Sequence, residues 1–294
     1  MKIFNSPVYP IPPSFDNQEE LDLESTERYI HFLTNEGAKI LMTTAGTSQF
    51  NLMSLRELRK LNELVGKGEY TKILGLPAIS YHHLKDELEY LNKQNYENCS
   101  VIVIFPERYY NDEQVYGFFK KVCEISNYPI LAHGNPIQRG NGGVKDYDNI
   151  LLKKLSTLEK FIGIKEESSS LEFASKNLKD LDLEIIVAGG SMKRFWFLQP
   201  FGATTYLTGV GSFNPKIEED FYSNFSNQKF QESKTIMENY ETPLFETFMS
   251  VGWHASMRES LIEMGYIKFN RCPFVEMSIE DKEKIKLQLK QILI

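Results

Sequence analysis

The sequence predicts an α/β fold, a (β/α)8 TIM barrel followed by a C-terminal helical extension. First, short apolar runs alternate with longer segments of helical spacing, and this pair recurs along the chain. Second, the apolar runs are nearly uniform instead of alternating with polar residues, which is typical of a parallel sheet covered on both faces. Third, eight such runs over about 210 residues fit the size of this barrel, which is typically ~250 residues.

The eight predicted strands are short runs rich in apolar and β-branched residues. They cover residues 2–9, 39–44, 71–79, 99–105, 128–133, 161–166, 183–190 and 204–211. Segments with helical spacing follow at 55–65, 84–94, 113–125, 144–155, 170–181 and 192–202. A doubly wound sheet is the competing fold, but no GxGxxG follows the first strand and no Walker loop is present.

The pattern changes after Pro215, where helical segments continue without a clear strand. We therefore expect two parts, a barrel over residues 1–215 and a helical extension over 216–294 that packs on the barrel. No Pro- or Ser-rich linker separates the two parts, which argues against a fully independent second domain.

The composition is that of an ordinary globular protein and excludes several classes. The 294 residues are 41% hydrophobic and 25% charged, with a formal net charge of −7. A mildly acidic chain without a long basic run gives no support for a nucleic-acid partner. No apolar run approaches the roughly 18 residues of a membrane span, and the N-terminus lacks the apolar core of a signal peptide. We expect a cytoplasmic protein with no membrane partner.

The cysteines and histidines are not spaced as metal ligands. The three cysteines are few and odd in number, as expected of reduced thiols in a cytoplasmic protein. The five histidines form no HExxH or similar cluster. We therefore expect no metal site and no cofactor.

Lys165 stands at the end of the predicted strand 161–166, within the stretch FIGIKEESSS. A charged amine at the end of a buried run must find a partner, reach solvent or lose its proton. An amine without its proton is a nucleophile that can form a Schiff base with a carbonyl group. Paired with Glu166 or another carboxylate, the same lysine would be structural. The position alone leaves both interpretations open.

Other polar residues follow the strands, where the chemistry of a parallel barrel is located. The turn with Thr47 and Ser48 offers hydroxyls beside backbone N–H groups, which suits a carboxylate or phosphate, or else a helix cap. His133 ends the fifth strand and is either a proton carrier or a structural histidine. Tyr109 and Tyr110 are either hydroxyl donors or packing aromatics.

Together these motifs resemble the dihydrodipicolinate synthase / N-acetylneuraminate lyase family of class I, Schiff-base aldolases. The most specific piece is GIKEES, which matches the family pattern GIK-E/D-x-S at the Schiff-base lysine. AGTSQFNLMSLRELRKL resembles the family's GTTGExxxLTxxER, and VIVIFPERYYN its strand-four PYY segment. YPILAHGNP resembles PxxLYNxP, and ATTYLTGVGSFNP resembles GxxGxISxxxNxxP. The five motifs occur in the family order and span roughly residues 3–215.

The resemblance implies a mechanism in which Lys165 captures a small-molecule substrate, pyruvate or a related 2-oxo acid, as an iminium. The iminium is an electron sink, so that a neighbouring C–C bond can break or form through an enamine. The resemblance also suggests a homo-tetramer or dimer. The implied catalytic residues are Lys165, His133 and Tyr110, and the implied substrate-binding residues are Thr47, Ser48, Gln49, Gly189, Gly209 and Arg139.

The chain departs from the family pattern at several of these positions. Gln49 stands where the family has glutamate, and Ser48 where it has glycine. His133 replaces a tyrosine that helps to carry protons, and a histidine titrates roughly 3.5 units lower. The tyrosine pair is displaced by two residues, and the substrate-binding arginine falls near Arg139. These changes argue against a true dihydrodipicolinate synthase or sialic acid lyase and favour another 2-oxo acid or sugar acid.

Three functional hypotheses follow from these residues. The first is a Schiff-base lyase or aldolase of unassigned substrate. The second is a 2-oxo sugar-acid dehydratase that uses the same iminium, because GTSQF resembles the GTGEF spelling of that branch. The third is a catalytically lapsed barrel with a binding or regulatory role; the changes at Gln49 and His133 motivate it, and the retained Lys165 argues against it.

Overall fold

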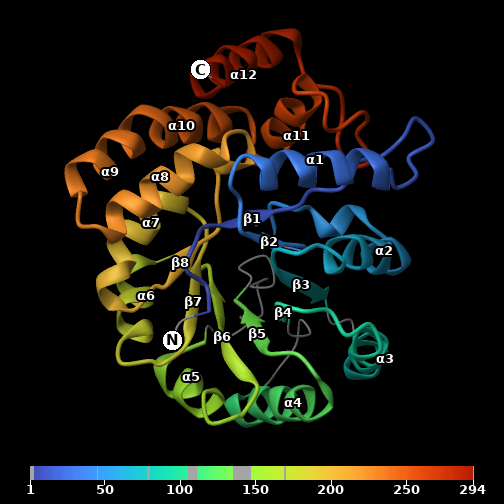
Figure 1. Cartoon of the computed structure of the whole chain (residues 1–294), viewed down its shortest axis with the longest axis vertical. Coiled ribbons are helices and arrows are strands. Elements are labelled where there is room, and N and C mark those ends of the chain that lie inside the picture. The colour runs from blue at the N-terminus through green and yellow to red at the C-terminus, as the bar shows by residue number, and fades with distance from the viewer. Residues whose placement is uncertain are drawn as a thin grey trace. The chain divides into compact units, whose positions relative to one another are not determined.

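A computed structural model describes residues 3–44, 46–77, 80–104, 111–134, 147–168 and 170–293 of the chain (Figure 1). The chain divides into two compact units, each described by itself below. The first unit comprises Met1–Asn5 and Gly66–Leu207, and the second comprises Ser6–Val65 and Thr208–Ile294. The predicted division at residue 215 stays a prediction.

Within the described residues, eight strands follow one another in sequence order along one sheet. They are β1 Val8–Pro10, β2 Ile40–Met42, β3 Thr71–Pro77, β4 Cys99–Ile104, β5 Ile130–His133, β6 Phe161–Glu166, β7 Glu184–Val187 and β8 Thr205–Tyr206. Nearly all their side chains are buried, as expected of strands covered on both faces. This order of parallel strands confirms the predicted barrel class.

In the first unit, β3 to β8 pair in parallel, each with its neighbour. The pairing of β5 with β6 places His133 opposite Lys165. Both residues lie at the carboxyl ends of their strands, because His133 is the last residue of β5 and Lys165 is the penultimate residue of β6. The sheet register therefore brings these two predicted site residues together.

The helices of the first unit lie on the outer side of these strands (Figure 1). They are α3 Tyr81–Asn92, α4 Asp112–Ile125, α5 Asn149–Leu155, α6 Leu171–Leu178 and α7 Ser191–Leu198. Four of them begin at a polar residue whose side chain accepts a backbone N–H of the first turn: Ser80, Asn111, Asp148 and Ser170. Such N-caps fix where each loop ends and its helix begins.

The second unit consists mostly of helices. They are α1 Leu23–Asn35, α2 Leu55–Gly66, α8 Pro215–Ser226, α9 Phe230–Ile236, α10 Thr242–Val251, α11 Trp253–Glu263 and α12 Ile279–Ile292. A π-helical turn, η5 Met237–Glu241, joins α9 to α10, and α10, α11 and α12 contact one another. The helices from α8 onward confirm the predicted helical character of the residues after 215.

Helix α1 was not predicted from the alternating pattern. Asp22 caps it, because its Oδ1 accepts a hydrogen bond from the Ser25 N–H at 2.9 Å. Tyr29, Ile30 and Leu33 are buried on one face at helical spacing. A capping aspartate before apolar residues three and four positions apart was the available sequence sign of this helix.

Strand β8 is shorter than the predicted 204–211, and a local carboxylate explains the difference. Glu218 of α8 is fully buried, and its Oε1 accepts the N–H groups of Gly209 at 3.2 Å and Gly211 at 3.1 Å. These backbone groups therefore bond to a side chain instead of a strand. The segment continues as the 3-10 turn η4 Val210–Ser212.

Gly163 of β6 allows a close approach to β7 and supports a stability prediction. A Cβ atom built on Gly163 would lie 2.0 Å from the Glu184 carbonyl oxygen. We expect Gly163→Ala to lower the free energy of unfolding by about 3 kcal/mol, because the paired backbone of β7 must shift. Urea denaturation measures this loss.

Gly117→Ala in α4 is the matched control, because nothing lies within 4 Å of a Cβ atom built there. That change should stabilise the protein by up to about 1 kcal/mol, since alanine favours a helix more than glycine does. Equal urea midpoints for Gly163→Ala and the unchanged protein would contradict the close packing of β6 on β7.

Candidate active site

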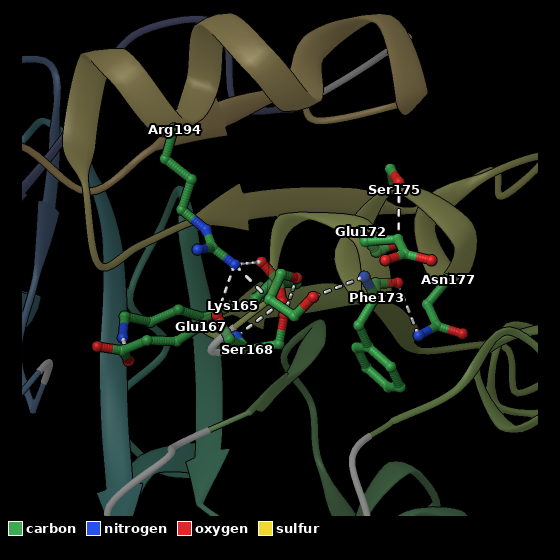
Figure 2. Close-up of polar contacts among 10 residues, drawn as sticks. Lys165, Glu167, Ser168, Glu172, Phe173, Ser175, Asn177 and Arg194 are labelled. Atoms are coloured by element: carbon green, nitrogen blue, oxygen red, sulfur yellow. Dashed lines mark hydrogen bonds and ion pairs between the residues drawn. The ribbon is translucent and has the colours of Figure 1, made fainter.

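Lys165 is completely buried near the end of β6, and its amine has two polar neighbours. The Nζ atom lies 2.8 Å from His133 Nε2 and 2.5 Å from Glu167 Oε2. Alternate residues of an extended chain point to the same side, which places the side chains of Lys165 and Glu167 together (Figure 2). The site is thus a cluster of an amine, an imidazole and a carboxylate.

Glu166, the partner considered for Lys165 from the sequence, is engaged elsewhere. Its Oε2 accepts a hydrogen bond from Arg194 Nη2 at 2.7 Å, and its Oε1 accepts the Ser168 N–H at 2.7 Å. Arg194 reaches from α7 and also donates to the Ser168 carbonyl oxygen at 2.8 Å (Figure 2). These contacts hold the chain immediately after Lys165 in place.

Burial and charge set the protonation states of the two groups beside Lys165. Burial lowers the pKa of His133 to about 4, with a further contribution from the positive charge of Lys165. Burial alone would raise the pKa of the Glu167 carboxyl, but Lys165 and His133 together hold it well below its usual range. At neutral pH the imidazole is therefore uncharged and the carboxylate is ionised.

His133 Nε2 lies within hydrogen-bond distance of both Lys165 Nζ, at 2.8 Å, and Glu167 Oε2, at 3.4 Å. A protonated Lys165 amine would donate to Nε2 and leave the ring proton on Nδ1, whereas a ring proton on Nε2 would be donated to the Glu167 carboxylate. Within the described part of the chain, Nδ1 has no hydrogen-bond partner. Nε2 is thus the ring nitrogen that faces both Lys165 Nζ and Glu167.

Glu167 is the site residue that sequence reasoning missed. Its side chain is 23% exposed, whereas the side chain of Lys165 is fully buried. Gly189, a predicted substrate-binding residue, lies against it, since a Cβ atom built on Gly189 would be 3.6 Å from Glu167 Cγ. The i, i+2 spacing of Lys165 and Glu167 was the sequence sign that could have found this pair.

In the second unit, Thr47, Ser48 and Gln49 are buried in the turn that follows β2. The Gln49 amide is engaged on both sides: Oε1 accepts from Arg258 Nη1 at 3.0 Å, and Nε2 donates to the His254 carbonyl oxygen at 3.2 Å. These contacts give Gln49 a part in holding the turn. Substrate binding by the three turn residues stays a prediction.

Arg258 anchors this turn from α11. Its guanidinium also donates to the Pro13 carbonyl oxygen at 3.1 Å and to Asn270 Oδ1 at 2.6 Å. Burial, with the nearby charge of Arg271, lowers the pKa of Arg258 to about 10. The side chain of Gln49 that accepts this hydrogen bond from Arg258 is a neutral amide. The family pattern has the carboxylate of a glutamate at this position.

The remaining predicted residues have different outcomes. Gly209, in the second unit, leaves room for an aromatic ring, since a Cβ atom built there would be 3.1 Å from Phe245 Cε2. Tyr110 and Arg139 lie outside the described residues.

The described residues contain no group of three or more His, Cys, Asp or Glu side chains placed to hold a metal ion. In the same part of the chain, no helix is both long enough and apolar enough to cross a membrane.

Residues 4–292 match the Dihydrodipicolinate synthetase family. The chain belongs to this family. It is 22% identical over 290 residues to a 4-hydroxy-tetrahydrodipicolinate synthase of Ehrlichia canis, covering 95% of this chain and 94% of that protein. It is also 22% identical over 253 residues to a probable 5-dehydro-4-deoxyglucarate dehydratase of Bacillus licheniformis, covering 81% of this chain and 76% of that protein.

Solved structures share the fold at low sequence identity. The N-acetylneuraminate lyase of Fusobacterium nucleatum superposes with a TM-score of 0.87 at 15% identity over the whole of both chains. The dihydrodipicolinate synthase of Aquifex aeolicus gives a TM-score of 0.85 at 18% identity over 98% of each chain. The predicted family and fold are confirmed, and the chain is an enzyme of the lyase and aldolase type. The relatives divide among synthases, dehydratases and lyases, so the family alone does not select the reaction.

Proposed function

We propose that this enzyme captures pyruvate or a related 2-oxo acid as an iminium on Lys165 and breaks or forms a C–C bond. The observation that carries the proposal is the buried Lys165 amine with proton acceptors at 2.8 Å and 2.5 Å. An amine that nucleophilic catalysis uses must shed protons, and both neighbours of Nζ can accept one.

The proposed reaction begins when Lys165 Nζ attacks the keto carbon of the 2-oxo acid. The keto oxygen leaves as water, and the C=N bond of the iminium takes its place. In cleavage, the electrons of the C–C bond one carbon removed from the iminium carbon flow into this cation to give an enamine, while the hydroxyl group of the departing fragment loses its proton and the fragment leaves as an aldehyde. The reverse flow forms the bond. His133, neutral at neutral pH and 2.8 Å from Nζ, carries protons in these steps.

The proposed substrate contacts come from the family resemblance. Thr47 and Ser48, with Gln49, would bind the substrate carboxylate, and Gly189 and Gly209 would line the site. Tyr110 as a catalytic residue and Arg139 as a carboxylate ligand stay predictions of the resemblance. A homo-tetramer or dimer in the cytoplasm is proposed on the same basis.

A dehydratase acting on a 2-oxo sugar acid is the second candidate. The similarity to the Bacillus licheniformis dehydratase favours it, as does the uninterrupted GTSQF turn. The same iminium would then promote loss of water from the substrate without cleavage of the carbon chain. Lys165, His133 and the turn would keep their parts in this reaction.

Borohydride trapping with a set of 2-oxo acids tests the proposal. Borohydride delivers a hydride to the iminium carbon and converts the C=N bond into a stable secondary amine, which intact-protein mass spectrometry detects. An adduct with pyruvate supports the lyase or aldolase. An adduct only with longer 2-oxo sugar acids supports the dehydratase, and the absence of an adduct with every 2-oxo acid contradicts both.

A further inference from the structure

Formation of the iminium requires Lys165 Nζ to lose two protons. Counted from an ammonium group, the nitrogen begins with three hydrogens, and the iminium nitrogen carries one. The two hydrogens leave with the keto oxygen as water, so ammonium and ketone give iminium and water with the same total charge. A complete site therefore needs groups that can accept each of these protons and return it to the departing oxygen.

The site holds two acceptors in direct contact with Nζ. His133 Nε2 lies at 2.8 Å and Glu167 Oε2 at 2.5 Å, and these two acceptor atoms are 3.4 Å apart. We propose that Glu167 is a further catalytic residue, which accepts one of the two protons while His133 accepts the other. Each proton then passes to the keto oxygen, which leaves as water. This inference rests on the proposed function of Lys165.

The charge of Glu167 also suits the product of this step. After both protons have left, Glu167 is ionised and His133 is neutral, as they were at the start. The carboxylate then faces the positive iminium across a hydrogen-bond distance, in a partly desolvated site where such attraction is stronger than in water. Glu167 would thus act first as a proton acceptor and then as the counter-ion of the intermediate.

Few charged groups other than Lys165 and His133 influence the protonation of Glu167. Among the described residues, the titratable groups that act on Glu167 are Lys165 of β6 and His133 of β5. The neighbouring carboxylate, Glu166, is held by Arg194 of α7 at 2.7 Å. From the β7 side, Gly189 presents no side chain to Glu167. The protonation of Glu167 is therefore coupled mainly to the two groups with which it would exchange protons.

A purely structural ion pair makes the opposite prediction. If Glu167 only held Lys165 as an ammonium ion, its removal would favour the free amine and capture would become faster or stay unchanged. If Glu167 is a proton acceptor, its removal makes capture slower. The sign of the rate change distinguishes the two roles.

Glu167→Gln keeps the size of the side chain and removes its capacity to accept a proton. With pyruvate as the probe and borohydride quenching at timed intervals, we expect the Lys165 adduct to form about 100-fold more slowly, the lower end of the range for general acid–base catalysis. The final amount of adduct should equal that of the unchanged protein. A rate equal to or faster than that of the unchanged protein would overturn the proposal.

Glu172→Gln is the matched control. Glu172 lies in the first turn of α6 and pairs with the exposed Lys176 at 3.0 Å. The substitution removes the same charge five residues further along the chain. It should leave the rate of adduct formation unchanged, so a slow Glu167→Gln variant cannot be explained by the net charge.

Chemical rescue separates catalysis from misfolding. In Glu167→Ala, added formate can replace the missing carboxylate, because the native side chain is 23% exposed and solutes can reach its place. We expect the adduct rate of this variant to rise with formate concentration, and that of the unchanged protein to stay constant. A slow alanine variant that formate does not restore would assign Glu167 a structural part and overturn the inference.

Failure of this inference differs from failure of the proposed function. If the unchanged protein forms no adduct with any 2-oxo acid, Lys165 is not a Schiff-base nucleophile and both statements fall. If it forms the adduct and Glu167→Gln forms it equally fast, the function stands and only the assignment of Glu167 falls.

Discussion

Lys165→Ala should abolish covalent capture of 2-oxo acids while the protein still folds. The substitution removes the amine that lies between His133 Nε2 and Glu167 Oε2, and neither neighbour can form an iminium. The carboxylate left behind is 23% exposed, so water can replace its lost partner and the loss of stability should be moderate. Intact-mass measurement after borohydride treatment, with circular dichroism to confirm folding, tests this result.

Lys72→Ala is the control for this variant, because among the described residues of the first unit Lys72 is the other buried lysine, with 2% exposure. Its Nζ donates to the carbonyl oxygens of Gly66 and Gly68, which makes it a structural donor at the start of β3. Lys72→Ala should lose stability and keep pyruvate capture. Undiminished turnover in Lys165→Ala would rule out the Schiff-base mechanism.

His133→Phe should lower the rate of turnover by about 100-fold, because general acid–base groups typically contribute 10²–10⁴-fold. Pyruvate capture should survive at reduced speed, since Glu167 still contacts Lys165 Nζ. Steady-state turnover and timed borohydride quenching measure the two effects separately. His31→Phe, on the exposed face of α1, should match the unchanged protein in both. An unchanged rate in His133→Phe would make His133 a structural residue.

The pH dependence of stability offers a second readout of His133. Burial lowers its pKa from 6.5 to about 4, so the unfolded chain binds this proton more tightly than the folded protein does. The stability that the neutral ring contributes is complete above pH 6.5, is lost progressively as the pH falls below 6.5, and is fully lost once the pH has fallen through about 4. Between about pH 7 and about pH 5 this group alone should lower the free energy of unfolding by about 2 kcal/mol. In His133→Phe that part of the acid sensitivity should be absent from urea denaturation.

The sequence predicts best those elements that are buried along their whole length, because they appear as continuous apolar runs. Strand β6 begins and ends where the sequence predicts, at Phe161 and Glu166, because its apolar run is bounded by polar residues. Helix α1 was not predicted because its few buried apolar residues stand among charged and polar ones, which weakens the helical pattern in the sequence. Strand β8 was predicted too long because the carboxylate that ends its pairing, Glu218, comes from the following helix.

The residues of the site could also be predicted only in part. Lys165 and His133 could be identified because each ends a predicted strand, and the β5–β6 register brings them together. Glu167 was missed because its role depends on the direction of its side chain after the strand, which the sequence motif leaves free at that position. Glu166, considered as the partner of Lys165, faces Arg194 of α7, a pairing that depends on packing between distant segments.

The measurement that tests the central claim most directly is the location of the reduced pyruvate adduct. After borohydride treatment and proteolysis, peptide mass spectrometry distinguishes the peptide that contains FIGIKEESSS from the peptide that contains Lys72. We expect the adduct on Lys165 alone. An adduct on Lys72 or another lysine, with Lys165 unmodified, would contradict the account.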